Sequence, residues 1–357
     1  MKFNYTCETH GVSALKQAFT QIRPYRLFAL GVLLSSGLIM SCSSDTESLD
    51  TAQELAQEQQ NFSLVPAPLE PNEIKGFSAV SADTKLAEED RGRFNISLRY
   101  LVNMSPRQTE VFETAAARWE RIIIQDVPSI TATLPSAFEG VPPIEGTIDD
   151  IVIEVVVAAI DGPGQVLGQA GPRYTRNVDG LPVSGVMFFD EADLDYLDEL
   201  NLFEDVIVHE MGHVLGVGTL WNYAGRSLLQ GTLTNPFFAG HMAKVHWSAE
   251  GGTEALPIEN QGGGGTALSH WRESILRNEL MTGYINLGEN PLSRITAGSL
   301  GDLGYGTAVV GEEYYLPKGT EGEVTASSVT GPQEESLHIA EREIILEPVG
   351  FVRTANE

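Results

Sequence analysis

The sequence of 357 residues contains very little cysteine, because only Cys7 and Cys42 occur and both lie within the first 42 positions. The chain after residue 42 therefore cannot form a disulfide within itself. It also offers no thiolate, which excludes a catalytic cysteine and a cysteine-based metal site. Chemistry in this part of the chain has to use other side chains.

Basic residues are scarce as well: 22 Lys and Arg stand against 49 Asp and Glu, a formal net charge of -27. Nucleic acid and anionic membrane surfaces repel a protein this acidic, so neither is expected to bind it directly. No glycine-rich pattern of Walker type is present, so nucleotide phosphates are not indicated either. The charge favours solubility and does not identify a reaction.

The N-terminus has the order of an export signal. Residues 1–26 carry four basic residues and one acid, and an apolar run follows at residues 27–40. That run is too short to favour a membrane-spanning helix and has the flanks of a secretory signal. We therefore expect residues 1–41 to be a signal peptide and the protein to be exported.

The end of this run resembles the lipobox of bacterial lipoproteins, in which a cysteine is acylated and becomes the new N-terminus. Cys42 holds that place here, and Ser43 follows it. The resemblance implies a lipid anchor to the membrane at Cys42, in the bacterial outer membrane or at the cell surface. An ordinary signal peptide followed by an incidental cysteine is the alternative.

Composition divides the rest of the chain into three parts. Residues 42–90 are rich in Ser, Gln, Glu, Asp and Pro without a sustained apolar period, which predicts an acidic linker or a pro-segment. Residues 91–306 hold the periodic apolar segments and predict one domain, with subdomains at 91–216 and 217–306. Residues 307–357 predict an acidic C-terminal tail.

Within the predicted domain, strand and helix signals alternate. Ser105 before Pro106, with Gln108 at the third helical position, predicts a helix start. Its apolar residues recur at helical spacing, so one face is expected to pack on a sheet. Strands are predicted from alternation or β-branched runs, and a glycine-rich stretch ending in proline predicts an edge strand. These segments are 94–100, 151–158 and 184–189 for the strands, and 165–172 for the edge strand.

A second helix carries the pattern that points to chemistry. Asn201 is a candidate cap, and the helix contains His209, Glu210 and His213 before Gly216 ends it. Histidines four residues apart share a helix face, with Cβ atoms about 5–6 Å apart, and can bind one Zn²⁺ at about 2.0–2.1 Å. A glutamate directly after the first histidine can reach a water on such a metal.

A catalytic zinc site needs a third protein ligand and an open position. The chain has only seven histidines, and five of them fall between residues 209 and 270, where the candidates after the helix are His241, His246 and His270. The residues alone leave the choice among these three open. A glutamate ligand, Glu273 or Glu279, would instead indicate a different class of zinc peptidase.

The helix sequence resembles a known family. Residues 209–216 read His-Glu-x-x-His-x-x-Gly, the beginning of the metzincin pattern, but Thr219 stands where the compact pattern has its third histidine. The leishmanolysin-like metzincins, especially their bacterial members, carry a long insertion at this point. The segments that match them span about residues 93–306 and include 265–273, 278–284, 291–296 and 302–305.

This resemblance implies a fold and a ligand set. The fold is α+β: a metzincin-type catalytic domain with a twisted, mostly parallel sheet, an antiparallel edge strand, two main helices and an irregular C-terminal subdomain. His270 becomes the third zinc ligand, and Met281 forms the Met-turn beneath the metal. Independently of the resemblance, Glu273 would be a hydrogen-bond acceptor that orients His270 if that stretch is helical, and an exposed acid is the alternative.

The resemblance also implies a reaction, the zinc-dependent hydrolysis of protein or peptide substrates with Glu210 as general base on the zinc-bound water. The substrate would lie extended along a strand edge near residues 166–171. A surface-binding lipoprotein with an inert metzincin fold is the alternative. The presence of Glu210 favours the enzyme, because an inert site has no need of a general base.

Overall fold

The computed structural model describes residues 61–78, 92–262, 266–308, 310–316 and 336–354. All of them belong to one compact unit, Gln59–Glu357. The predicted signal peptide and Cys42 lie outside the described residues. Among the residues that are described, no helix has both the length and the apolar character needed to cross a membrane.

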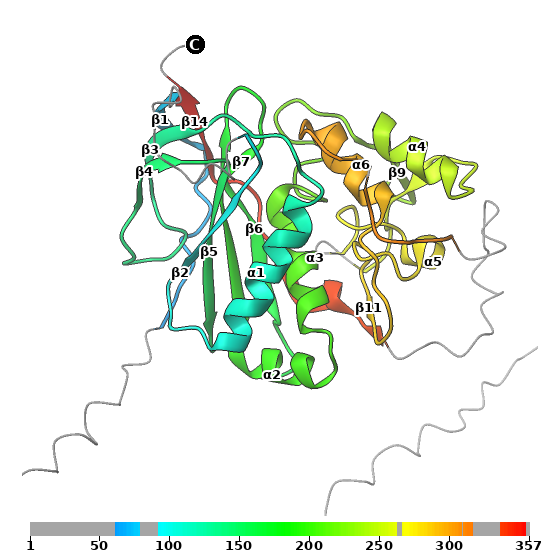
Figure 1. The fold of residues 1–357 in the computed structure, drawn as a ribbon, viewed down its shortest axis with the longest axis horizontal. Helices are drawn as coiled ribbons and strands as arrows, with labels where there is room; N and C mark the ends of the chain where they lie inside the picture. Colours follow the sequence, from blue (N-terminus) through cyan, green and yellow to red (C-terminus); the bar gives the residue numbers. More distant parts are fainter. Residues whose placement is uncertain (1–60, 79–91, 263–265, 309, 317–335, 355–357) are drawn as a thin grey trace, which may run out of the picture. The chain divides into compact units, whose positions relative to one another are not determined.

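A mixed β-sheet forms the frame of this unit (Figure 1). Its order is β2-β5-β7-β6-β14-β1-β3-β4, and β13 also pairs with β6. β2, β5 and β7 run parallel, whereas β6 runs antiparallel to β7. The strands are β1 Asn72–Ser78, β2 Ile96–Tyr100, β3 Ile130–Leu134, β4 Ile144–Ile148, β5 Ile151–Ala158, β6 Gly168–Arg176, β7 Pro182–Asp190, β13 Glu343–Ile345 and β14 Gly350–Thr354.

Two helices, α1 (Pro106–Glu120) and α3 (Phe203–Leu215), pack side by side against this sheet (Figure 1). The predicted start of α1 is confirmed, since Ser105 and Gln108 form a reciprocal capping box. The indole of Trp119 in α1 donates a hydrogen bond to the Val208 carbonyl of α3, 3.0 Å away. The arrangement is α+β, with both helices tied to each other inside the core.

The predicted cap of the second helix is wrong. Asn201 has a positive φ of 58° and lies before the helix, which begins at Phe203 without a side-chain cap. Its acidic first turn is instead bound by α1, because Arg118 contacts Glu204 at 3.3 Å and Asp205 at 3.1 Å. Acidic side chains near a helix N-terminus also complement its dipole, so this end is stabilised without a cap.

The strand predicted near residues 165–172 is present as the antiparallel β6, but it is not an edge. β13 lies parallel to its first half, and β14 lies parallel to its second half. Both come from residues 336–354, within the stretch predicted as an acidic tail. A strand that enters from so far along the chain leaves no local signal at residues 165–172.

The remaining elements are shorter and less regular. α4 and α6 pack closely. A Cβ at Gly298 of α6 would lie only 2.8 Å from the backbone nitrogen of Ala243 in α4, so the contact requires glycine. These elements are β8 Leu229–Thr232, β9 Asn235–Phe238, α4 His241–Ala249, β10 Leu256–Pro257, α5 Glu273–Leu276, β11 Ile285–Asn286, α6 Arg294–Leu303, β12 Ser336–Leu337 and η1 Ile339–Glu341. A further helix, α2 (Glu191–Glu199), precedes α3.

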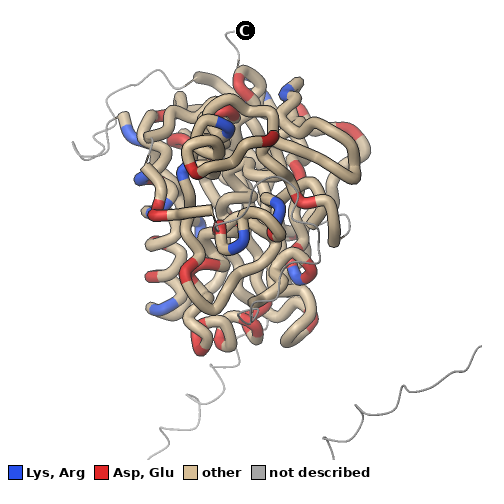
Figure 2. The backbone as a smooth tube through the Cα atoms, turned by 90° about the vertical axis from the view of Figure 1, so that its right-hand side faces the viewer, with Lys and Arg blue, Asp and Glu red and all other residues tan. Residues whose placement is uncertain are grey.

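Acidic residues are spread over the unit and gather at the end where α2 lies (Figure 2). Asp190 caps α2 with its own carboxylate, which accepts a hydrogen bond from Ala192 at 2.9 Å. The acidic run at 190–198 is therefore largely helical. Its two buried acids, Asp190 and Asp193, accept hydrogen bonds from backbone groups, and its exposed acids favour solubility.

Helix α3 lies very close to β7 at one point. A Cβ added at Gly185 would lie 2.2 Å from Cγ1 of Val214, well inside van der Waals contact. Any side chain at this position would push the helix away from the sheet. Gly185 therefore sets the depth at which the histidine-bearing helix is seated.

We expect Gly185→Ala to lower the free energy of unfolding by about 1–3 kcal/mol, because overpacking a well-filled core costs this much. Urea denaturation of the single variant measures the loss. The matched control is the double variant Gly185→Ala/Val214→Ala, in which the second change removes the clashing methyl groups. Its destabilisation should be smaller than the sum of the two single effects. Strict additivity would contradict this account of the packing.

Candidate metal centre

Three buried histidines meet at one point in the structure. His209 and His213 lie on α3, and His270 lies just before α5, after the long insertion. Their Nε2 atoms are 3.0 Å apart for His209 and His213, 3.2 Å for His209 and His270, and 3.1 Å for His213 and His270. All three side chains are fully buried.

The opposite ring nitrogen of each histidine is fixed by a backbone carbonyl. The Nδ1 atoms donate to Leu280 O at 2.7 Å for His209, to Val217 O at 2.8 Å for His213, and to Thr266 O at 3.1 Å for His270. A carbonyl oxygen can only accept, so each Nδ1 carries the proton. Each Nε2 then presents a lone pair to the other two.

Three converging lone pairs repel one another unless a cation lies among them. Ligand atoms about 2.0–2.1 Å from a tetrahedral zinc ion are about 3.3 Å apart, close to the spacing seen here. Backbone acceptors on the outer nitrogens are also the usual support of metal-binding histidines. The donor set and its geometry therefore fit a zinc ion.

The structure brings His270, and neither of its two rivals, to the pair on α3. His241 and His246 lie on α4, where His241 is exposed and His246 is half-buried, and neither belongs to the cluster. The predicted acceptor for His270 is wrong, because the Thr266 carbonyl holds its ring and Glu273 does not. A backbone acceptor has no signature in the sequence, whereas a nearby glutamate does.

A fourth group joins the cluster that the sequence did not indicate as a ligand. Glu343, the first residue of β13, places Oε1 3.0 Å from Nε2 of His270 and Oε2 3.3 Å from Nε2 of His209. Its side chain is completely buried. Burial would raise the pKa of Glu343, but positive charge on the neighbouring imidazoles, His270 first, holds it well below the usual range, as a cation held among the Nε2 atoms also would. Glu343 is therefore a carboxylate aimed at the centre.

Glu210 is the other carboxyl group at the centre. It is fully buried, and neither oxygen has a hydrogen-bond partner among the described residues. Burial, together with the neighbouring Glu343, raises the pKa of Glu210 well above its usual value. Burial also lowers the pKa of His213, to about 3, which keeps this imidazole neutral. The site thus contains a neutral imidazole at His213 and a carboxyl group, Glu210, that favours its protonated form.

Met281 lies against the back of the histidine helix. A Cβ at Gly212 would come within 2.8 Å of Sδ of Met281 and 2.9 Å of Cζ2 of Trp119, so this helix position has room only for glycine. The preceding residue, Leu280, supplies the carbonyl that holds His209. The turn at 280–281 therefore supports the cluster through both packing and a hydrogen bond.

A buried carboxylate holds this turn in place. Glu279 accepts hydrogen bonds from the backbone of Met281 at 2.7 Å and from the hydroxyls of Ser293 at 2.7 Å and Thr296 at 2.5 Å. Burial raises the pKa of Glu279, although these donors oppose the shift. Because its oxygens are bonded in this way, Glu279 stabilises the turn and does not belong to the metal-binding cluster.

The chain reverses directly after α3. Gly216 ends the helix with a φ of 117°, and its backbone donates to the carbonyls of Gly212 and His213. The turn puts the Val217 carbonyl against His213. Thr219, at the place where the compact pattern has a histidine, donates its hydroxyl to the His213 carbonyl at 2.8 Å. This residue supports a ligand and does not serve as one.

Glu259 organises the return of the chain to His270. Its backbone nitrogen donates to the His270 carbonyl at 2.8 Å, and its carbonyl accepts from Leu268 at 3.0 Å. Its side chain accepts from the backbone of Glu273 at 3.1 Å. Sequence reasoning missed this residue, because a loop glutamate that binds backbone groups looks like any solvated acid.

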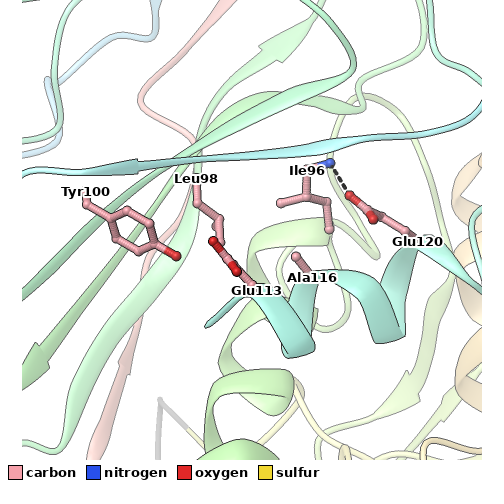
Figure 3. A pocket seen from close by; sticks show the side chains of 6 residues that line it. All are labelled: Ile96, Leu98, Tyr100, Glu113, Ala116 and Glu120. Atoms are coloured by element: carbon pink, nitrogen blue, oxygen red, sulfur yellow. Dashed lines mark hydrogen bonds between the residues drawn. The ribbon is translucent and has the colours of Figure 1, made fainter. Parts of the chain in front are cut away.

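A hollow elsewhere on the unit is separate from the metal centre. It lies between the sheet strand β2 and helix α1, where Glu120 accepts a hydrogen bond from the backbone of Ile96 at 2.8 Å (Figure 3). None of the four cluster residues lines it. The lining residues are Ile96, Leu98, Tyr100, Glu113, Ala116 and Glu120.

Comparison with known proteins shows that this chain is similar to the leishmanolysin family. Residues 147–321 match the model of that family, described as leishmanolysin. The leishmanolysin-like peptidase of Drosophila pseudoobscura pseudoobscura is 42% identical over 64 residues, which are 18% of this chain and 9% of that protein. The leishmanolysin-like peptidase of Drosophila melanogaster is 47% identical over 53 residues, 15% of this chain and 8% of that protein. The chain thus matches less than a tenth of these relatives' length, and the family match supports a metallopeptidase.

We expect His270→Ala to weaken zinc retention by more than the roughly 10–100-fold that loss of an outer-shell partner costs, because a direct ligand is removed. Zinc content after dialysis against a competing chelator measures this. His246→Ala is the matched control, since His246 lies outside the cluster. Loss of zinc from the control, with retention in the His270 variant, would refute the ligand assignment.

Proposed function

We propose that the protein is a zinc-dependent endopeptidase of the leishmanolysin family that hydrolyses proteins or peptides outside the cytoplasm. The observation that carries the proposal is the convergence of three buried Nε2 atoms beside the buried, unpartnered Glu210. All of these residues lie within the segment that matches the leishmanolysin model. Neither the geometry nor the family match alone would favour this reaction as strongly.

His209, His213 and His270 would hold the zinc ion, each oriented by its carbonyl partner. When bound, zinc supplies Lewis-acid chemistry: it polarises a scissile carbonyl and makes a water molecule acidic near neutral pH, with a pKa of ~7. Glu210 would take the proton from that water and pass it to the leaving amine.

Met281 and Gly216 would not touch the substrate and would instead hold the histidine ligands in position. Met281 packs against Gly212, directly before His213, and so supports the helix from behind. Gly216 lets the chain reverse so that the Val217 carbonyl meets His213. The substrate would be an extended peptide that pairs with the strand edge near residues 166–171, which β13 occupies in this structure, because extended chains bind by adding a strand to a sheet.

A second candidate is a non-catalytic lipoprotein that retains the fold for surface binding. The observation that favours it is Glu343, because three histidines and a carboxylate make a closed set of four ligands, as in structural zinc sites. Glu210 favours the enzyme, since a structural site gains nothing from a buried carboxyl group without a bonding partner. Cleavage of casein that a chelator blocks would decide between the two.

We expect Glu210→Ala to keep zinc bound and to lower peptidase activity by roughly 10²–10⁴, the contribution of a positioned general base. Zinc content and casein cleavage, measured on the same preparation, separate binding from chemistry. The matched control is Glu204→Ala in the first turn of the same helix, which removes an exposed carboxylate far from the cluster. Undiminished cleavage by the Glu210 variant would exclude it as the base.

The export and lipid anchor are part of the same proposal. An acidic protein is not attracted to an anionic membrane surface, so a covalent lipid at Cys42 would supply the attachment. One acyl chain binds a membrane only weakly, and stable anchoring takes more than one.

We expect Cys42→Ser to abolish incorporation of labelled fatty acid when the full chain is expressed in a bacterium. The Cys7→Ser variant is the matched control, because it changes the other cysteine and should leave labelling unchanged. Label retained by the Cys42 variant would rule out the anchor.

A further inference from the structure

The chain's own C-terminal segment crosses the metal centre. We call residues 336–346 the strap; it contains β12, η1 and β13. Figure 1 shows it in red and orange-red, running from beside β11 to β6. Glu343 lies between its two ends and enters the histidine cluster. A single segment thus reaches the site from outside the part that matches leishmanolysin, residues 147–321.

The first half of the strap is attached to the side of the site that holds His270 and Met281. Leu337 pairs with Ile285 as β12 and β11, and the ring of His338 stacks on Tyr284 with centroids 4.1 Å apart. Ala340 accepts a hydrogen bond from the Thr266 hydroxyl at 2.9 Å. Thr266 is the residue whose carbonyl holds His270, so the strap touches the support of a ligand.

The second half of the strap is attached to the sheet. Leu167 donates to the Arg342 carbonyl at 2.7 Å, and Leu346 donates to the Ala170 carbonyl at 2.7 Å. Between them β13 runs parallel to β6, with Glu343 opposite Gly168. These are the backbone groups of β6 that an extended substrate would need. Strap and substrate therefore compete for one strand edge.

Glu343 competes with the reacting water in the same way. A catalytic zinc site keeps one position open for water or substrate, and Glu343 aims a carboxylate into that position. A side-chain carboxylate contains no peptide bond, so it can ligate without being cleaved. The alternation along the strap places Glu343 inside and leaves the next residue, Ile344, 41% exposed.

We infer that the strap holds the enzyme latent, with Glu343 as a displaceable fourth metal ligand and β13 in place of the substrate strand. This inference rests on the proposed peptidase function. The structure, with β13 paired to β6 and Glu343 at the histidines, is then the inactive form. Activity then requires the strap to leave β6 and Glu343 to leave the histidines, whereupon a water takes the freed position beside Glu210.

Two features indicate that Glu343 is displaceable and not a permanent ligand. Glu210 is kept buried without a hydrogen-bond partner among the described residues, a destabilising arrangement that a purely structural site does not need. The strap is also held by short pairings, two residues long at β12 and three at β13. The histidines, in contrast, rest on a 13-residue helix and a turn fixed by buried hydrogen bonds.

The test uses the full chain with Co²⁺ in place of zinc, because the visible spectrum of Co²⁺ reports its ligands. Acetohydroxamate is the probe, since it binds the metal only where a position is free. Glu343→Ala and the near-isosteric Glu343→Gln are compared with wild type. Glu347→Ala is the matched control, because Glu347 is an exposed acid just beyond the same strap.

We expect acetohydroxamate to bind Glu343→Ala at least about tenfold more tightly than wild type, with a clear spectral change, and Glu347→Ala to behave as wild type. Peptidase activity of Glu343→Ala should rise at least about tenfold. Equal binding of the probe to wild type and Glu343→Ala would overturn the inference. If the alanine variant does not fold, acetohydroxamate binding is compared between wild type and Glu343→Gln instead, and equal binding of the probe to these two overturns the inference.

The outcomes separate this inference from the proposed function. A Glu343→Ala protein that binds acetohydroxamate but cleaves no protein would refute the peptidase, while the assignment of Glu343 as a metal ligand would stand. A wild-type chain that binds the probe freely and cleaves protein would refute the latency and support the peptidase. A wild-type chain that retains no metal would overturn both.

Discussion

The candidate site depends on one repeated interaction, the hydrogen bond from each histidine Nδ1 to a backbone carbonyl. Leu280, Val217 and Thr266 supply these carbonyls from three separate loops, at 2.7 Å, 2.8 Å and 3.1 Å. Each bond fixes a tautomer and a ring plane, and together they make the Nε2 lone pairs converge. The surrounding fold holds these three carbonyls in fixed positions around the histidines.

Close packing fixes the positions of helix α3 and of the turn at 280–281 relative to each other. Gly185 seats α3 on β7, and Gly212 lets Met281 approach the helix from behind. Glu279, whose oxygens accept bonds from the turn and from α6, keeps Met281 and Leu280 in place. A shift of the helix would carry His209 and His213 away from His270 together, so these contacts act on the ligand geometry even though none of them touches the metal position.

Local features were predictable from the sequence, and long-range ones were not. The capping box at Ser105 and the i, i+4 spacing of the helix histidines depend on neighbouring residues, so their pattern suffices. The resemblance to leishmanolysin placed His270 across an insertion that spacing could not bridge. Glu343 escaped notice because a glutamate before two isoleucines predicts only a strand. The carbonyl partners were equally hidden, since every residue has one. The positive φ of Asn201 came from the tight link between α2 and α3, which overrode its capping preference.

The position of β14 has a consequence for the order of events during synthesis. This strand lies between β6 and β1, so the half of the sheet formed by β1, β3 and β4 joins the other half only through it. Gly350, where β14 begins, is made after Glu343. The ribosome therefore releases the strap before the sheet can be completed. Every chain whose sheet is complete therefore already contains Glu343, the carboxylate of the histidine cluster.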